Sequence, residues 1–228
     1  DFGSDSFSEQ VCRGAKSLEI KLQAKNAQLR RRNRELRAER EQVELLRAET
    51  ESALMTTVDL LAKAAELHDD VTGKHVNRVG QYSATMAEFL GMSADFINEI
   101  RYCATLHDVG KMSVDQAILH KPGRLTDDEF KEMQNHTLYG FQILQDVERL
   151  KMAADIALSH HEKWVGGGYP NGIAGENIPL SARIVAFADI YDALRSVRPY
   201  KRGFTHEESI DIMLNGDDRL DPSKHFDP

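Results

Sequence analysis

The sequence predicts an all-α protein in which a long N-terminal helix precedes a compact helical domain. No Gly or Pro interrupts residues 16–67, and residues with high helix propensity dominate that stretch. Beyond it, apolar residues recur at helical spacing between capping and breaking signals. No segment keeps the alternation of period two that indicates a β-strand. We therefore expect a flexible lead over 1–14, a helical linker over 15–54 and a globular domain over 55–228.

The N-terminal helix carries apolar residues at every seventh position. These positions are Leu22, Leu29, Leu36 and Val43, and the partner positions are Leu18, Lys25, Arg32, Glu39 and Leu46. A helix of this length needs a surface to pack against. The pattern favours a parallel coiled coil that joins two copies of the chain and relays a signal into the domain behind it. The alternative is a solvated helix with a narrow apolar stripe, because the middle of the partner positions is polar.

The first helices of the globular domain are expected to deliver two histidines. One helix should cover residues 75–90 and end at Gly91. Ser93 should cap the next helix, which runs into His107 and Asp108.

The remaining helices follow similar signals. Capping boxes start at Thr126 and Thr205, where a Glu follows three residues later. Between them we expect helices over 138–147 and 150–162, and a third that starts at Ser181. The tail from residue 216 is polar and rich in breakers, so we expect no regular structure there.

Charge and cysteine content narrow the functional classes. Residues 16–51 carry ten Lys/Arg and seven Asp/Glu, a net of +3, whereas residues 52–228 carry 18 and 27, a net of −9. An acidic domain is a poor binder of duplex nucleic acid, because that affinity needs many cationic contacts. No uninterrupted apolar run reaches the roughly 18 residues of a membrane span. The two cysteines, Cys12 and Cys103, do not suggest a disulfide framework, so we expect a cytoplasmic protein.

A set of histidines and aspartates predicts a metal centre. Its members are His75, His107, Asp108, His136, His160, His161 and Asp189. Imidazoles and carboxylates suit hard divalent metals, and the set contains no cysteine, which argues against structural zinc. The two oxygens of Asp108 could bridge two ions. Two such ions could hold a hydroxide and clamp a phosphate between them.

The members of this set support one another. A single histidine is more often a surface or core residue than a ligand, but adjacent histidines that end an apolar helix, His160 and His161, are hard to explain by packing. Asp189 lies in an apolar run, where a buried carboxylate must be paired or metal-bound. Lys111 follows Asp108 by three residues and should project on the same side of the helix. We therefore assign catalytic roles to Asp108 and Lys111, the lysine neutralising a phosphate oxygen or assisting the leaving group.

Two further segments could contact a substrate. Tyr169 follows the glycine run 166–168, so its ring stands on a loop that could cover the metal site. Arg198 and Lys201 belong to a cationic group that could bind a second phosphate. The alternatives are a flexible surface loop and a solvated basic turn.

The motifs resemble those of the HD-GYP domain, a branch of the HD phosphohydrolase superfamily. The main ones are His107-Asp108-Val109-Gly110-Lys111, His160-His161-Glu162-Lys163-Trp164 and Gly168-Tyr169-Pro170. The resemblance covers about residues 55–215 and implies a compact HD-type helical domain with a metal site, often of iron or manganese, with magnesium, nickel or zinc as further options. It implies hydrolysis of the bacterial messenger cyclic di-GMP to pGpG, GMP or both, and an upstream sensor or receiver domain.

The resemblance also assigns roles to single residues. It implies that the seven candidates above are the metal ligands and that Lys111 is the catalytic lysine. Arg198 and Lys201 are similar to the family's phosphate contacts, and Tyr169 belongs to its signature loop. Two positions depart from the family pattern. Val71 stands where members with three metals carry a glutamate, so we expect two metals, and Val165 replaces an aspartate of the signature loop.

Three other hypotheses remain open from the sequence. The substrate could be the mixed cyclic GMP-AMP. The domain could bind a cyclic dinucleotide without turnover and signal through the N-terminal helix, which the departure at Val165 favours. A di-iron helical protein that binds oxygen would also use histidines and carboxylates, although Lys111, Arg198 and Lys201 have no role in such a protein.

Overall fold

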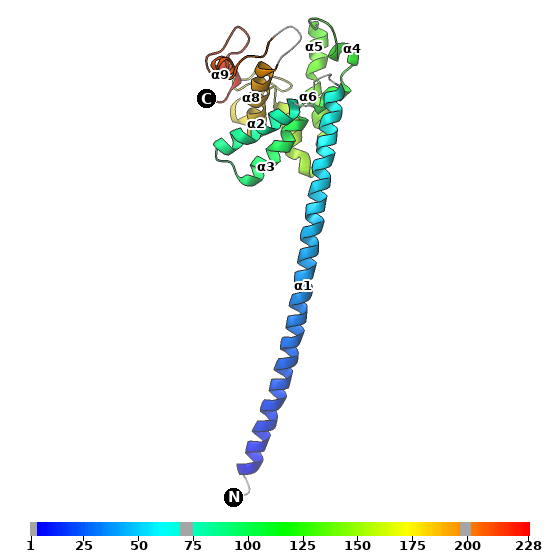
Figure 1. The fold of residues 1–228 in the computed structure, drawn as a ribbon, viewed down its shortest axis with the longest axis vertical. Helices are drawn as coiled ribbons and strands as arrows, with labels where there is room; N and C mark the ends of the chain where they lie inside the picture. The colour runs from blue at the N-terminus through cyan, green and yellow to red at the C-terminus, as the bar shows by residue number, and fades with distance from the viewer. Residues whose placement is uncertain (1–3, 69–74, 197–201) are drawn as a thin grey trace. The chain divides into compact units, whose positions relative to one another are not determined.

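The computed structural model describes residues 4–68, 75–196 and 202–228, and these ranges contain helices and loops but no β-strand. The predicted all-α fold is therefore confirmed (Figure 1). The chain divides into two compact units, Asp1–Leu54 and Met55–Pro228. Among the described helices, none combines the length and the apolar character that a bilayer crossing requires.

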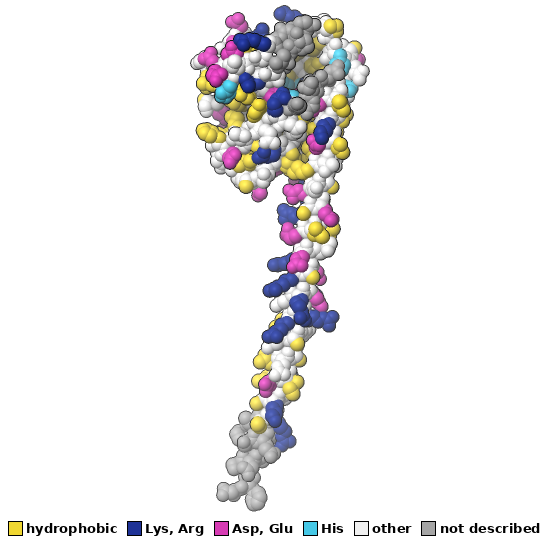
Figure 2. Space-filling view, viewed as in Figure 1, with side chains coloured by type: hydrophobic (Ala, Val, Ile, Leu, Met, Phe, Trp, Pro, Cys, Tyr) yellow, Lys and Arg dark blue, Asp and Glu magenta, His cyan; other side chains and the backbone are white. Residues whose placement is uncertain are grey.

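The first helix, α1, runs from Ser4 to His68. It begins earlier than expected, because no Pro interrupts residues 4–14, and the flexible lead predicted there is wrong for those residues. Leu22, Leu29 and Leu36 are 60%, 52% and 42% exposed in the single chain. Figure 2 shows charged and apolar side chains interspersed along this helix. The coiled coil stays a prediction.

The second unit contains the last turns of α1 and a set of shorter helices. Their bounds are α2 His75–Phe89, α3 Ala94–Cys103, α4 Gln116–Leu119, α5 Asp127–Gln134, α6 His136–Leu144, α7 Lys151–Ser159, α8 Leu180–Arg195, α9 His206–Asn215 and α10 Pro222–His225. Short 3₁₀ turns join them: η1 Ala104–Leu106, η2 Val109–Ser113, η3 Glu148–Leu150 and η4 Gly175–Asn177.

The predicted helix starts are confirmed where capping residues define them. The Ser93 side chain accepts a hydrogen bond from the Phe96 N–H at the start of α3. Complete capping boxes open α5 at Thr126 and α9 at Thr205. Each box satisfies backbone N–H groups that a helix leaves unpaired at its first turn. Gly91, two residues past the end of α2, adopts φ 72°, which fits the break predicted there.

Helix-on-helix packing forms the core of the second unit. The main contacts join α2 with α3 and α8, and α7 with α6 and α8, the group gathered around α2 and α8 in Figure 1. The side chains of Ile100, Ile156 and Ile184 are fully buried between these helices. Because the helices pack so closely, their ends are held at fixed positions relative to one another.

Several predicted boundaries need correction. The helix expected to run into His107 and Asp108 ends at Cys103 and tightens into η1. Helix α6 begins at His136 itself, and α7 ends at Ser159, before the two histidines. The predicted helices thus exist, but these five candidate ligands lie at or just beyond their ends.

The polar tail is also more ordered than predicted. It contains α10, with Pro222 in its first turn, where a missing N–H costs nothing. The ring of Phe226 packs 5.0 Å from that of Phe187 on α8, and Asp227 pairs with Arg183. Tertiary contacts therefore order a segment whose composition predicts no regular structure.

Candidate metal centre

The candidate ligands converge although they come from separate segments. His75 begins α2, His107 and Asp108 lie between η1 and η2, His136 begins α6, His160 and His161 follow α7, and Asp189 lies inside α8. Helix ends suit this purpose, because the chain changes direction there and can turn a side chain inward. The structure therefore brings all seven predicted metal ligands to one place.

Asp108 lies at the middle of this cluster. Its Oδ2 is 3.2 Å from Nε2 of His107. Its Oδ1 is 3.4 Å from Nε2 of His136 and 3.7 Å from Nε2 of His160. The two oxygens of one carboxylate thus face different imidazoles, which is the arrangement a bridging ligand needs.

The ligands form two groups that share Asp108. In the first, one donor atom from each of Asp108, His136, His160 and His161 lies within 4.8 Å of the others, and we name it the His161 group. In the second, donors of His75, His107 and Asp108 satisfy the same distance. Asp189 Oδ1 adds to this second group, because it lies 3.4 Å from Nε2 of His75 and 3.8 Å from Nε2 of His107. We name the four residues the His75 group.

Backbone carbonyls orient three of the imidazoles. Nδ1 lies 2.9 Å from the Ala104 carbonyl in His107 and 2.7 Å from the Met133 carbonyl in His136. In His160, Nδ1 lies 3.0 Å from the Ile156 carbonyl. A carbonyl oxygen can only accept, so each Nδ1 must carry the hydrogen and donate it. In the neutral form of each ring, Nε2 therefore presents a lone pair to the cluster, as a metal-binding histidine does.

Several buried atoms of the cluster fit a bound cation. Among the described residues, no hydrogen-bond partner reaches Nε2 of His107, His136 or His160, or Oδ1 of Asp108. Leaving a buried polar atom unpaired costs about 1–3 kcal/mol. Divalent cations would satisfy all four atoms at once, and mixed imidazole and carboxylate donors suit such ions. The residues present therefore fit the two metals that the sequence predicts.

Burial and neighbouring charges shift the pKa values of several candidate ligands toward the protonation state that binds a metal. Burial lowers the pKa of His136 to about 4, and burial together with nearby His160 holds the pKa of His161 well below its ordinary value. Burial would raise the pKa of Asp108, but the positive charges of Lys111 and His107 hold it well below its usual range. The neutral imidazoles of His136 and His161 thus lie beside an ionised carboxylate.

His107 differs from the other imidazoles. Burial alone would lower its pKa, but the negative charge of Asp108 overcomes that effect and raises the pKa to about 9. In the metal-free protein this imidazole therefore carries a proton at neutral pH.

Lys111 points toward the same carboxylate. Its Nζ lies 2.8 Å from Oδ2 of Asp108. The preceding Gly110 lies so close to α6 that a Cβ there would collide with the backbone of His136 and Gly140. This contact fixes the turn that carries Asp108 and Lys111 against the helix that begins with a ligand.

The signature loop packs on the His161 group. The Tyr169 ring stacks on His161 with ring centres 4.7 Å apart and meets His136 edge-on at 6.2 Å. Burial raises the pKa of Tyr169 above its ordinary value. Glu162 holds the loop, because its Oε1 accepts hydrogen bonds from the N–H groups of Asn171 and Gly172 at 2.8 and 3.0 Å.

The structure describes only one of the two positions that depart from the family pattern, and neither of the predicted phosphate contacts. Val165 is 56% exposed, so this side chain faces solvent rather than the ligands. Val71, Arg198 and Lys201 lie outside the described residues. The phosphate contacts of Arg198 and Lys201 therefore stay a prediction.

One residue of this region has no assigned role in the sequence analysis. The side chain of Asp192 is fully buried, and its Oδ2 lies 2.7 Å from Nδ1 of His75. Burial would raise its pKa, but hydrogen bonds from Arg78 and His75 lower it to about 2. Its spacing was a usable signal, because Asp192 follows Asp189 by three residues and so shares its helix face.

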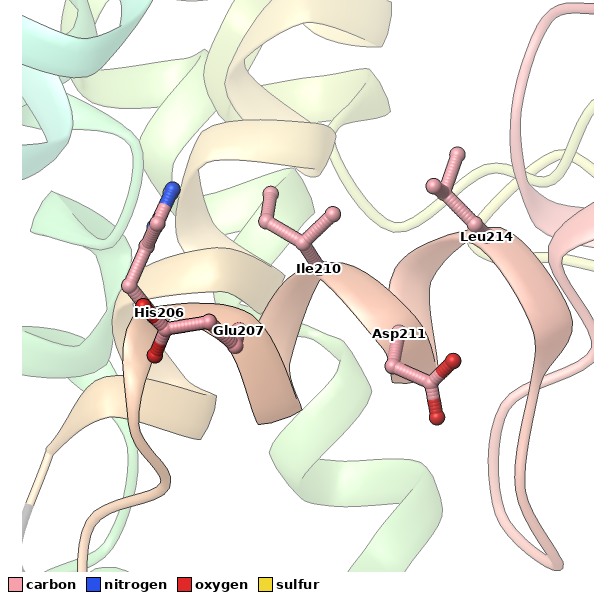
Figure 3. Close-up of a pocket in the computed structure, with 5 residues that line it drawn as sticks. All are labelled: His206, Glu207, Ile210, Asp211 and Leu214. Carbon is pink, nitrogen blue, oxygen red and sulfur yellow. The ribbon is translucent and has the colours of Figure 1, made fainter.

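A surface hollow lies on α9, and its lining contains no residue of the predicted ligand set. Its lining consists of His206, Glu207, Ile210, Asp211 and Leu214. Figure 3 shows Ile210 and Leu214 projecting from the same side of the helix. None of these five residues is a predicted ligand.

The chain is similar to a known domain family and to several characterised proteins. A family model described as "HD domain" matches residues 59–223. A cyclic di-GMP phosphodiesterase of Vibrio cholerae is 42% identical over 179 residues, which cover 72% of this chain and 35% of that protein. A 3'3'-cGAMP-specific phosphodiesterase 2 of the same organism is 41% identical, with 72% and 31% covered. The chain thus spans about a third of the length of these relatives.

A solved structure supports the fold. The crystal structure of a cyclic GMP-AMP specific phosphodiesterase of V. cholerae matches with a TM-score of 0.57 at 18% identity, covering 77% of this chain and 46% of that one. At this identity the likeness concerns the arrangement of helices alone.

Proposed function

Because this chain belongs to the HD domain family, we propose that it is a metal-dependent phosphodiesterase that hydrolyses cyclic di-GMP to pGpG, GMP or both. The observation that carries the proposal is the position of Asp108, whose two oxygens face two separate groups of imidazole nitrogens. A carboxylate so placed suits a pair of cations. The two relatives named above, both phosphodiesterases for cyclic dinucleotides, support the reaction class.

The residues of the chain would divide the work as follows. The His161 group and the His75 group would each hold one divalent cation, iron or manganese, with Asp108 shared between them. When bound, two such ions lower the pKa of water and stabilise negative charge on a phosphate. Lys111 would lie beside that phosphate and offset charge that develops during hydrolysis.

The substrate side of the site would use the signature loop and the cationic segment. Tyr169 stacks on His161, so its ring would lie beside a ligand bound at the His161 group. Arg198 and Lys201 would bind the second phosphate of a cyclic dinucleotide. The domain is acidic overall, so these cations and the bound metals would supply the local positive charge that an anionic substrate needs.

The mixed dinucleotide is the second candidate substrate. One relative at 41% identity carries the name of a 3'3'-cGAMP-specific enzyme, close to the 42% of the cyclic di-GMP relative. The two identities are too similar to choose between the substrates. Both dinucleotides present the same phosphates to the metal centre and differ only in one base.

The long helix suggests how the domain would be controlled. We propose that α1 pairs in parallel with a second copy of the chain through its seven-residue apolar repeat. Leu29 and Leu36 are half exposed in the single chain, which a coiled-coil partner would correct. A sensor or receiver domain ahead of the helix would then act on a dimer.

Product analysis tests the proposed reaction. The chain is loaded with Mn²⁺ or Fe²⁺ and incubated separately with cyclic di-GMP and 3'3'-cGAMP, and the products are separated by chromatography. We expect the linear dinucleotide or mononucleotides from the unaltered chain and none from Asp108→Ala. The matched control is Asp128→Ala, which removes a carboxylate that is 96% exposed, and it should retain full activity.

Two outcomes would reject the proposal. One is the absence of product from the unaltered chain with both metals and both substrates. The other is equal product from Asp108→Ala. Tight binding without hydrolysis would instead favour a dinucleotide sensor.

A further inference from the structure

We propose that Asp192 is a positioning residue that holds His75 as a ligand and so sustains the metal of the His75 group selectively. The inference rests on the proposed two-metal centre. Asp192 would support the metal of the His75 group but not that of the His161 group. Asp192 contributes no atom to either group of ligands. It would act through His75.

The contact between the two residues is short and sheltered. Asp192 comes from α8 and His75 from the first position of α2, and these two helices pack against each other. Oδ2 of Asp192 lies 2.7 Å from Nδ1 of His75. A carboxylate beside Nδ1 keeps the hydrogen on that nitrogen, so the lone pair is on Nε2, which lies 3.4 Å from Asp189 Oδ1.

Arg78 fixes the carboxylate in turn. Its Nε donates to Oδ1 of Asp192 at 2.6 Å and its Nη2 to Oδ2 at 2.8 Å. Arg78 follows His75 by three residues on α2, so both reach the same side chain of α8. This two-pronged contact leaves Asp192 one orientation and keeps its charge compensated in a buried place.

His75 needs this support more than His107, His136 and His160 do. The side chains of His107, His136 and His160 are at most 2% exposed, and backbone carbonyls accept from their Nδ1 atoms. The side chain of His75 is 17% exposed, and its recorded Nδ1 partner is a side chain. Packing and backbone hold the first three rings, whereas a replaceable carboxylate holds the fourth.

The carboxylate also changes the ligand chemically. A hydrogen bond to an anion makes the opposite ring nitrogen a stronger donor than a bond to a neutral carbonyl does, and loss of such a partner costs about 10–100-fold in metal affinity. Among the described residues, the side-chain hydrogen bonds of Asp192 go to His75, Arg78 and Ser196 and to no member of the His161 group. Removing the carboxylate should therefore weaken one of two metals.

Metal counting tests the inference without measuring activity. The unaltered chain, Asp192→Ala and Asp192→Asn are saturated with Mn²⁺, passed through a desalting column and analysed for bound metal, and affinities are measured by calorimetric titration. We expect two metals per chain before substitution and about one after Asp192→Ala. Asp192→Asn keeps an acceptor for Nδ1 of His75 but loses the charge. The metal affinity of the His75 group should therefore fall about 10-fold.

Two further variants separate positioning from general destabilisation. Val185→Ala removes part of a fully buried side chain from the same helix and should lower the melting temperature while two metals remain. Arg78→Lys keeps the charge but loses the two-pronged contact that orients Asp192, so it should weaken the same metal, by less than Asp192→Ala does.

The possible results are distinguishable. Two metals of unchanged affinity in both Asp192 variants would overturn the inference and leave the proposed function standing. Equal metal loss in Asp192→Ala and Val185→Ala would also overturn it, because the effect would then follow stability. If Asp192→Ala does not fold, the isosteric Asp192→Asn decides alone. An unaltered chain that binds no metal would instead reject the proposed function.

Discussion

Nζ of Lys111 lies 2.8 Å from Oδ2 of Asp108, the same oxygen that faces Nε2 of His107 at 3.2 Å. The lysine is thus held at the edge of the cluster by a predicted ligand. A cation in that place can offset charge on a phosphate that the cluster binds. The pair therefore links the fold of η2 to the proposed chemistry.

Replacing this lysine should separate catalysis from metal binding. Lys111→Met should lower kcat for a cyclic dinucleotide by about 10²–10³-fold, because one preorganised charge is lost. Two metals should remain bound, since no ligand is removed. Lys131→Met is the control, because Lys131 is 74% exposed on α5 and should have no effect. An unchanged kcat, or a loss of both metals, would contradict the assigned role.

Metal affinity should rise with pH in the metal-free protein. Asp108 raises the pKa of His107 to about 9, so its imidazole is protonated at neutral pH and must lose that proton to bind a metal. Affinity should therefore fall as pH drops below about 9, by up to about tenfold per unit for one proton. His136 adds nothing above about pH 5, because burial lowers its pKa to about 4. Calorimetry in buffers of different ionisation enthalpy measures the released proton, and a binding constant independent of pH between about 6 and 8 would refute this.

The close approach at Gly110 predicts a strong steric effect. Gly110→Ala places a Cβ against the His136 carbonyl, so η2 and α6 must move apart. We expect a loss of at least about 1–3 kcal/mol in unfolding free energy, the usual cost of overpacking, together with weaker metal binding. Denaturant titration of the metal-free protein measures the change in unfolding free energy.

The control for that substitution lies on α1. A Cβ at Gly14 would meet nothing within 4 Å, so Gly14→Ala should be neutral or gain about 0.5–1 kcal/mol, as Ala does in a helix interior. Equal stability of the two variants would show that the contact at Gly110 is not constraining.

The apolar repeat of α1 predicts a dimer. The double substitution Leu29→Glu and Leu36→Glu should convert a dimer to a monomer, because charges would replace the apolar seam. Ala24→Glu and Ala38→Glu add the same charge at exposed positions outside the seam and should leave the dimer intact. Sedimentation equilibrium distinguishes the states. A monomeric unaltered chain would remove the basis of the coiled coil.

The sequence alone was sufficient for the helical class, for most helix starts and for membership of the HD domain family. Capping at Ser93, Thr126 and Thr205 depends on residues three positions apart, so a local pattern contains the whole interaction. The ligand types were equally readable, because His107 and Asp108 sit beside one another in the chain. Arg198 and Lys201 lie outside the described residues, and their role stays a prediction.

Tertiary structure decided how these residues meet. His75 and Asp192 are 117 positions apart, and only the packing of α2 on α8 brings them within 2.7 Å. The same holds for the order of the tail, which Phe187 and Arg183 of α8 supply through contacts rather than propensity. Periodicity reports which face of a helix is apolar, but the distance between two helices depends on how all their side chains fit together. For that reason the sequence predicted the ligands, whereas the residue that holds one of them became visible only in the folded chain.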